Sequence, residues 1–238
     1  MKIFATAQHQ AYEFLRDRII LGEYPGGMRL KPEHIAETMG LSRMPVREAL
    51  RQLDSEGLVT IHPNRGASVT LLTADDILEF FEMRAALEGV AVRLATPNIG
   101  DDGLHDLDHY LEKMRRSEND HLVWIDRHDE FHEFLCGWSR RPRLCAEIKR
   151  LRITIVPYLR LYTAHFQERE IPGYEHEVIL DAIRQGDPDV AEDCMRKHVM
   201  ANAHNIAHCL SDARNVIPAA GSSADSKPGS GPAGALSR

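Results

Sequence analysis

Apolar side chains at helical spacing predict three short helices in the first 55 residues. The first has Ala11, Phe14, Leu15, Ile19 and Ile20 on one face and ends near Gly22; the second begins at Pro32 and ends at Gly40. Ser42 is placed to cap the third, which runs to about Ser55 with Val46, Ala49, Leu50 and Leu53 inward. Two β-like runs follow, 58–61 and 67–70, joined by 62–66. Three helices and a hairpin predict a winged helix-turn-helix.

From Thr73 onward the pattern is helical, beginning with a run that carries Ile77, Phe80, Phe81, Leu87, Val90 and Leu94. Breaks at 97–100, 117–120, 139–142, 170–173 and 186–188 predict six helices, the last reaching about Leu210, packed as an antiparallel bundle. In 218–238, 12 of 21 residues are Gly, Pro or Ser, which predicts disorder. The expected fold is mostly α, with a winged domain at 1–72, an all-helical domain at 73–212 and a disordered tail at 213–238.

Composition narrows the class of protein. The 238 residues contain no apolar run of transmembrane length, and the N-terminal stretch lacks the apolar core of a signal peptide, so we expect a cytoplasmic protein without a membrane partner. The four cysteines show no C-x-x-C spacing and are interpreted as buried thiols: Cys136, Cys145, Cys194 and Cys209. The net charge of −7 is unevenly distributed, because 1–72 holds nine basic and eight acidic residues. A nucleic-acid partner for that segment is therefore not excluded.

Basic side chains mark one face of the third helix. Arg43, Arg47 and Arg51 recur every four residues opposite its apolar face, where arginine can bond guanine or pair with phosphate in a major groove. The alternative is an ordinary solvated charged face. The segment Asn64-Arg65-Gly66 adds a second basic element at the hairpin tip, where glycine permits close approach to a phosphate. Together the two elements favour DNA binding.

Three of the histidine pairs are spaced four residues apart: His105/His109, His128/His132 and His204/His208. Such spacing places two imidazoles on one helix face, close enough to share a metal ion. The first and last pairs are predicted to lie on the surface. The pair His128/His132 is surrounded by apolar residues, so it is either a satisfied pair in the core or part of a metal site.

Residues 12–70 contain the runs LRDRIILGEYPGGMRL, IAETMGLSRMPVREALRQLDSEGLVTI and HPNRGASV. These runs, with SRxPVREAL as the most specific part, carry a resemblance to the DNA-binding domain of GntR-type bacterial transcription regulators. It implies that the operator-reading helix contributes Ser42, Arg43, Pro45 and Arg47, and that the wing contributes Asn64, Arg65 and Gly66. Met44 departs from the family, which often has Thr or a similar polar residue at this position.

The C-terminal part contains the segments EFHEFL and EHEVILDAIRQGDPDVAEDCMRKH. These segments carry a resemblance to the helical effector domain, called FCD, of the FadR-type branch, many members of which hold a metal with one Asp and three His. It implies His132, His176 and His198 as ligands, with His128 where the family usually has Asp. An all-nitrogen site favours Zn²⁺ or Ni²⁺ over Mn²⁺. Two alternatives remain: Asp129 supplies the fourth ligand, or His128 does not bind.

A metal held by neutral histidines keeps positive charge, so we expect a small carboxylate or sugar-acid effector. Arg84 is either an ion-pair partner of Glu88 or a carboxylate clamp, and further candidates for the effector cavity are Arg152, Tyr158, Tyr162 and Asn202. The sequence thus predicts a homodimeric regulator, a repressor rather than an activator, in which each winged domain reads half of a palindromic operator.

Two other functions fit parts of the sequence. HDEFH superficially resembles the helix of zinc peptidases, but the general base there is Glu directly after the first His, and this chain has Asp129. A metal hydrolase is therefore disfavoured. In the third hypothesis the helical domain only dimerises and its histidines are structural.

Overall fold

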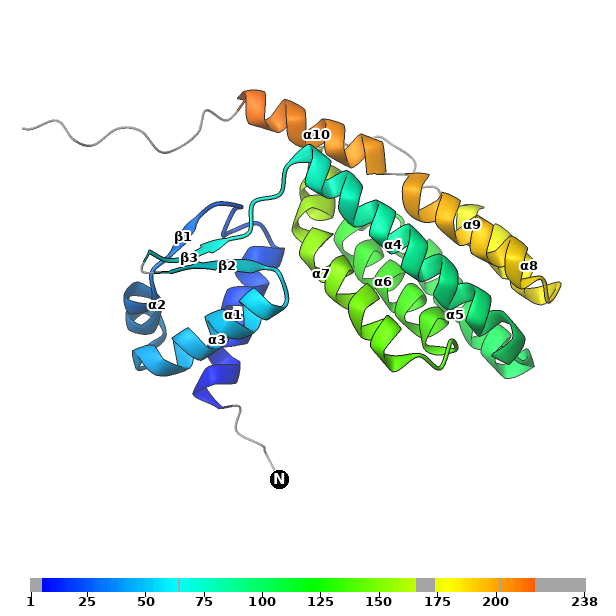
Figure 1. The fold of residues 1–238 in the computed structure, drawn as a ribbon, viewed down its shortest axis with the longest axis horizontal. Coiled ribbons are helices and arrows are strands. Elements are labelled where there is room, and N and C mark those ends of the chain that lie inside the picture. The colour runs from blue at the N-terminus through cyan, green and yellow to red at the C-terminus, as the bar shows by residue number, and fades with distance from the viewer. Residues whose placement is uncertain (1–5, 64, 166–173, 202, 217–238) are drawn as a thin grey trace, which may run out of the picture.

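The computed structural model describes residues 6–63, 65–165, 174–201 and 203–216. A winged domain and a helical domain lie side by side (Figure 1). Asn64 and Asn202, two of the predicted site residues, lie outside the described residues, as does the segment 217–238 of the predicted tail.

The winged domain contains three helices and a small sheet. Helix α1 (Ala7–Ile20) is followed by β1 (Arg29–Leu30), α2 (Pro32–Met39), α3 (Arg43–Ser55), β2 (Val59–His62) and β3 (Gly66–Val69). The strands are antiparallel in the order β1-β3-β2. Their core includes Leu15, Val46 and Leu53, all with 0 % exposure. The predicted winged helix-turn-helix is confirmed. Strand β1 was not predicted, because two residues are too few to show alternation.

The helical domain begins at α4 (Ala74–Ala95) and continues through a short 3₁₀ turn (Thr96–Asn98). The following helices are α5 (Asp101–Arg116), α6 (His121–Gly137), α7 (Pro142–His165), α8 (Tyr174–Arg184), α9 (Pro188–Ala201) and α10 (Ala203–Val216). Helix α4 packs against four other helices of the bundle: α6, α7, α9 and α10. None of the described helices combines the length and apolar character needed to cross a lipid bilayer.

Thr73 and Asp76 cap the start of α4. The Thr73 hydroxyl accepts the backbone N–H of Asp76 at 3.0 Å, and the Asp76 carboxylate accepts the backbone N–H of Thr73 at 2.6 Å. This reciprocal capping box satisfies two backbone donors that a helix start leaves without partners. It also defines the point at which the chain leaves the winged domain.

Three sequence predictions about the bundle need correction. The single helix expected up to about Leu210 is two helices, α9 and α10, on either side of residue 202. Helix α10 also continues to Val216, four residues beyond the boundary set at 212. On α4, Val90 is 40 % exposed, whereas Arg84 and Glu88 are buried. The apolar pattern misplaced this face because two polar side chains satisfy one another inside the bundle.

Candidate functional site

Helix α3 presents the predicted arginines to solvent. Arg43 and Arg47 are exposed, Pro45 is half-buried in the first turn, and the carboxylate of Glu33 lies 3.7 Å from the Arg43 guanidinium. Ser42 occupies the N-cap position with an extended backbone, but its side chain makes no capping hydrogen bond, contrary to our expectation. Its exposed hydroxyl is therefore not used to cap the helix.

The wing tip is formed by the turn between β2 and β3. Arg65 is exposed in this turn, and Gly66 has a φ of +86°, a conformation that glycine adopts readily and other residues rarely do. Gly66 is thus needed for the turn geometry itself, in addition to the close approach to phosphate that the sequence suggested. Ser42, Arg43, Arg47 and Arg65 remain predicted DNA contacts.

Four histidines from three helices converge inside the bundle. This histidine cluster consists of His128 and His132 on α6, His176 on α8 and His198 on α9. One ring nitrogen from each lies within 4.8 Å of the others. The Nε2 atoms of His128 and His132 are 3.1 Å apart, those of His132 and His198 are 3.2 Å apart, and those of His128 and His198 are 3.4 Å apart.

These separations suit nitrogen ligands around one small cation. Ligands at the usual Zn–N distance, in tetrahedral geometry, lie about 3.3–3.4 Å from one another. Hydrogen bonds alone do not satisfy these three Nε2 atoms well, because each neutral imidazole has only one N–H to donate. If His128 and His198 both donated to Nε2 of His132, their two protons would point toward each other. The donor set therefore fits a divalent transition metal of the zinc type.

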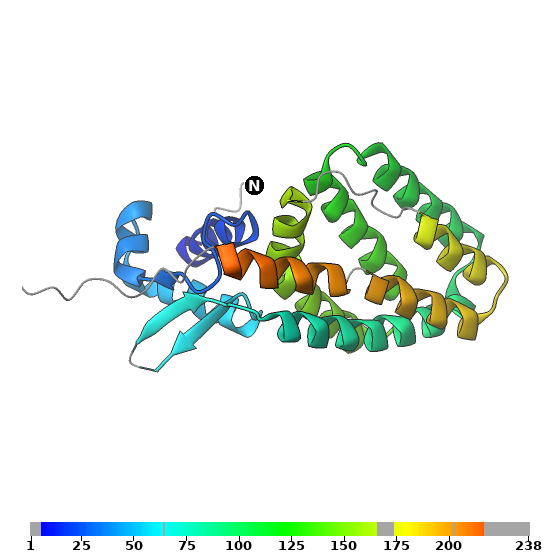
Figure 2. The same ribbon diagram turned by 90° about the horizontal axis from the view of Figure 1, so that it is seen from above.

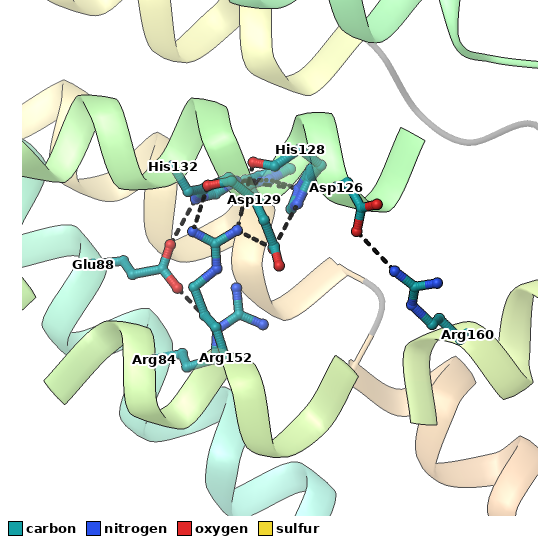
Figure 3. Close-up of polar contacts among 9 residues, drawn as sticks. Arg84, Glu88, Asp126, His128, Asp129, His132, Arg152 and Arg160 are labelled. Atoms are coloured by element: carbon teal, nitrogen blue, oxygen red, sulfur yellow. Dashed lines mark hydrogen bonds and ion pairs between the residues drawn. The ribbon is translucent and has the colours of Figure 1, made fainter. Parts of the chain in front are cut away.

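Glu88 of α4 orients His132. The Nδ1 atom of His132 lies 2.6 Å from Oε2 of Glu88, and Oε1 of Glu88 accepts a hydrogen bond from Nε of Arg84 at 2.9 Å (Figure 3). Glu88 and His132 are both 0 % exposed. With the carboxylate on Nδ1, the proton of His132 is held there and the Nε2 lone pair faces the other rings. Of the two interpretations of Arg84, the structure shows the ion pair with Glu88.

The same surroundings keep two of the rings neutral. Burial, followed by the positive charge of Arg152, holds the pKa of His132 well below its usual range. Burial and repulsion between the two rings lower the pKa of His128 in the same way. A neutral imidazole retains the lone pair that a metal ion requires.

Asp129 is not among the groups that converge in the histidine cluster, although its carboxylate lies 3.9 Å from Nδ1 of His128. Its carboxylate pairs with the guanidinium of Arg152 on α7, and Arg152 also donates to the backbone oxygen of Asp129 at 3.2 Å (Figure 3). Burial alone would raise the pKa of Asp129, but the charge of Arg152 and a hydrogen bond to His128 outweigh it and lower the pKa to about 2. Of the two candidates for the fourth position, the structure therefore brings His128, and not Asp129, to the other three histidines.

Two of the predicted effector residues, Arg152 and Tyr158, contact different parts of the molecule. Arg152 is 5 % exposed, and its Nε has no hydrogen-bond partner among the described residues. The Tyr158 hydroxyl instead bonds the segment between the two domains, accepting from Leu72 N–H at 2.8 Å and donating to the Thr70 carbonyl at 3.0 Å. This corrects the role we expected for Tyr158 in the effector cavity. The side chains of Tyr162 and Asn202 lie outside the described part of the chain.

Aromatic rings line the histidine cluster. The Trp124 ring stacks on His128 with centroids 4.9 Å apart, and Phe131 contacts His176 at 5.3 Å. The two aromatic rings lower the polarity around the histidines, and electrostatic interactions are stronger in less polar surroundings. The sequence indicates the pairing of Glu88 with Arg84 but not the contact of Glu88 with His132. The signal was available: an acidic residue at a core-facing position of a helix needs a buried partner.

Comparison with known proteins assigns the family. The model for bacterial regulatory proteins of the gntR family matches residues 7–69, and the FCD domain model matches residues 79–201. The chain belongs to the GntR family of bacterial regulatory proteins and carries an FCD domain. It is a DNA-binding transcription regulator and not an enzyme, so the hydrolase alternative is not retained.

Similar proteins span nearly the same length. "Uncharacterized HTH-type transcriptional regulator YdhC" of Bacillus subtilis is 26% identical over 86% of this chain and 93% of its own. "Probable D-xylose utilization operon transcriptional repressor" of Paenarthrobacter nicotinovorans is 29% identical over 85% and 90%. Among solved structures, E. coli McbR/YncC has a TM-score of 0.69 at 25% identity and covers 88% of this chain and 100% of that one.

Proposed function

We propose that this regulator is a homodimeric, cytoplasmic repressor whose affinity for a palindromic operator is controlled by a small carboxylate bound at a metal site in the helical domain. The convergence of four histidine rings within 4.8 Å carries this proposal. The repressor assignment is supported by the name of the Paenarthrobacter relative. Two winged domains related by two-fold symmetry would each place α3 in one half-site.

His128, His132, His176 and His198 would hold the metal, with Zn²⁺ or Ni²⁺ preferred because the donors are imidazole nitrogens. When bound, the ion supplies uncompensated positive charge that attracts an anionic ligand. Glu88 fixes the tautomer of His132, while Trp124 and Phe131 exclude water from the rings.

The preference for a carboxylate rests on cations beside the histidine cluster. Arg152 has a buried Nε–H without a partner among the described residues, and a ligand carboxylate would satisfy it. Arg84 is already engaged with Glu88, so its remaining donors are secondary candidates for the same ligand. Sugar acids belong to this ligand class because they carry the same carboxylate.

The metal site is tested with His176→Ala, because His176 is 0 % exposed and its ring lies 4.2 Å from that of His198, centroid to centroid. Metal content after purification should fall, while the metal-free protein should bind an operator duplex, selected from a random-sequence pool, as well as wild type does. His109→Ala removes an exposed imidazole and serves as the control. Unchanged metal content in His176→Ala, or loss of DNA binding without loss of metal, contradicts the proposal.

The effector class is tested by thermal unfolding of metal-loaded and metal-stripped protein with a panel of small carboxylic and sugar acids. A ligand that binds only the folded protein raises its unfolding temperature. We expect a shift for some acids in the loaded protein and none in the stripped protein. A bundle that only dimerises would gain stability from no acid in either form.

A further inference from the structure

Helix α7 touches both functional parts of the molecule. Figures 1 and 2 show it, in yellow-green, on the side of the bundle that faces the winged domain. On its bundle side, Arg152 binds the Asp129 carboxylate and donates to the backbone oxygens of Asp129 and His128 at 3.2 and 3.5 Å. Helix α7 therefore holds the turn of α6 that carries His128 of the histidine cluster.

Thr154 can exchange its hydrogen bond to the winged domain for one within its own helix. Its hydroxyl lies 3.1 Å from the carbonyl oxygen of Glu56, the C-cap residue of α3, and 3.0 Å from the carbonyl oxygen of Arg150, one turn back in α7. A hydroxyl has one proton to donate. When the Glu56 contact opens, the proton is still accepted by Arg150, so the end of α3 separates from α7 without leaving that donor unsatisfied.

Tyr158, one turn further along α7, makes the more permanent contact. Its hydroxyl accepts from Leu72 N–H and donates to the Thr70 carbonyl, so its donor and its acceptor are both used by the segment that joins β3 to α4. Opening the contact would expose two buried polar groups, which is costly.

Room for movement exists at the same junction. A cavity of about 110 Å³ is lined by both domains, including Leu58 on one side and Thr154, Pro157 and Tyr158 on the other. Pro157 lacks an N–H, so the carbonyl of Ile153 receives no helical hydrogen bond from that position. Ile153 packs against the core of the winged domain. Helix α7 therefore bends most easily at the turn that contacts the winged domain.

We propose that α7 couples the histidine cluster to the DNA-reading helix, with Tyr158 as a fixed pivot, Thr154 as an exchangeable contact to the end of α3, and Arg152 as the connection to α6. This inference rests on the proposed function, because it requires a ligand at the histidine cluster. Thr154 and Tyr158 are positioning residues: they act on DNA binding through the orientation of α3, whereas Arg152 would bind the ligand and also contact α6. Occupancy that moves the turn at His128 shifts Arg152, and with it the balance of Thr154 between Glu56 and Arg150.

The test is hydrogen exchange of the full chain with and without Zn²⁺, followed in peptides that cover 53–60 and 68–74. In wild type, Zn²⁺ should slow exchange in α6, α8 and α9. It should also change the exchange rate at 53–60 by roughly three- to tenfold, because the net contribution of one hydrogen bond changes the population of the open state by about that factor. In Thr154→Val the histidine helices should respond as before, while the change at 53–60 disappears. In Tyr158→Phe exchange at 68–74 should be fast with and without Zn²⁺.

Matched controls remove a hydroxyl elsewhere. Thr96→Val removes a buried hydroxyl that donates only within its own helix region, to Val92 at 2.9 Å, and Tyr110→Phe alters a tyrosine that packs on Phe134 within the bundle. Both should keep the response at 53–60. Zn²⁺ protection of α6, α8 and α9 with no change at 53–60 in wild type overturns the coupling alone. No protection anywhere overturns the metal site and the inference with it, and an intact response in Thr154→Val refutes the role of Thr154.

Discussion

The substitution Glu88→Gln tests the hydrogen-bond chain that orients the metal site. The two carboxylate oxygens of Glu88 accept from Arg84 Nε at 2.9 Å and from His132 Nδ1 at 2.6 Å, and the side chain is 0 % exposed. Glutamine has the same shape but one acceptor and one NH₂ donor. One of the two partners must then face a donor.

Either orientation of the amide has a calculable cost. An NH₂ facing His132 moves the ring proton to Nε2 and removes the lone pair that points to the other histidines; loss of such outer contacts costs roughly 10–100-fold in metal affinity, or about 1.4–2.7 kcal/mol. An NH₂ facing Arg84 leaves a buried guanidinium without its acceptor, which costs about 1.5–3 kcal/mol of folding stability. We therefore expect weaker Zn²⁺ binding, lower stability, or both.

The assay is a chelator-competition titration of Zn²⁺ followed by emission from Trp124, whose ring stacks on His128. The chain has two tryptophans, so Trp138→Phe leaves Trp124 as the reporter. Urea unfolding of the metal-free protein measures stability. Glu133→Gln is the control: Glu133 is on α6, the helix of His132, and its exposed carboxylate pairs with Lys149 on α7. Zn²⁺ affinity within about twofold of wild type together with an unchanged urea midpoint would refute this account of Glu88.

Three further substitutions test individual contacts. Arg47→Ala should weaken operator binding, measured by fluorescence anisotropy, by about 1–3 kcal/mol, whereas Arg51→Ala, whose guanidinium lies 2.6 Å from a carboxylate in its own helix, should have the smaller effect; equal losses would contradict base contact by Arg47. Thr73→Ala should lower the free energy of unfolding by about 1 kcal/mol through loss of the capping box, and an unchanged urea midpoint would argue against it. Gly57→Ala should lower the unfolding temperature more than Gly22→Ala. Both glycines have positive φ, but only at Gly57 would the new Cβ lie 2.8 Å from Thr154 Oγ1. Equal shifts in unfolding temperature would contradict this contact.

Local patterns were sufficient for most of the winged domain. Leu15, Val46 and Leu53 were assigned to apolar helix faces and are fully buried, because spacing along a single amphipathic helix determines which side faces a core. Strand β1 was missed, since it exists only through pairing with β3. The hydroxyl of Ser42 was assigned to capping, although the N-cap position is occupied without it.

The candidate metal site divides in the same way. The spacing of His128 and His132 showed that two imidazoles share a helix face, whereas His176 and His198 entered only through resemblance to the family. Their convergence depends on how α6, α8 and α9 pack, which no local pattern contains. The position of the Asp129 carboxylate, the alternative candidate for the fourth ligand, depends on its ion pair with Arg152, a residue on a different helix.

The sequence by itself determined the class of this protein: a winged helix-turn-helix with arginines on its third helix, followed by a helical domain with several histidines. These features follow from periodicity, capping and residue type, which act over a few neighbouring residues. The tertiary structure decided the partners: Glu88 beside His132, Arg152 on Asp129, and Tyr158 on the segment between the domains instead of in the effector cavity. Buried polar groups are satisfied by whichever residue packing brings within hydrogen-bond distance, and that choice is made between helices far apart in the chain.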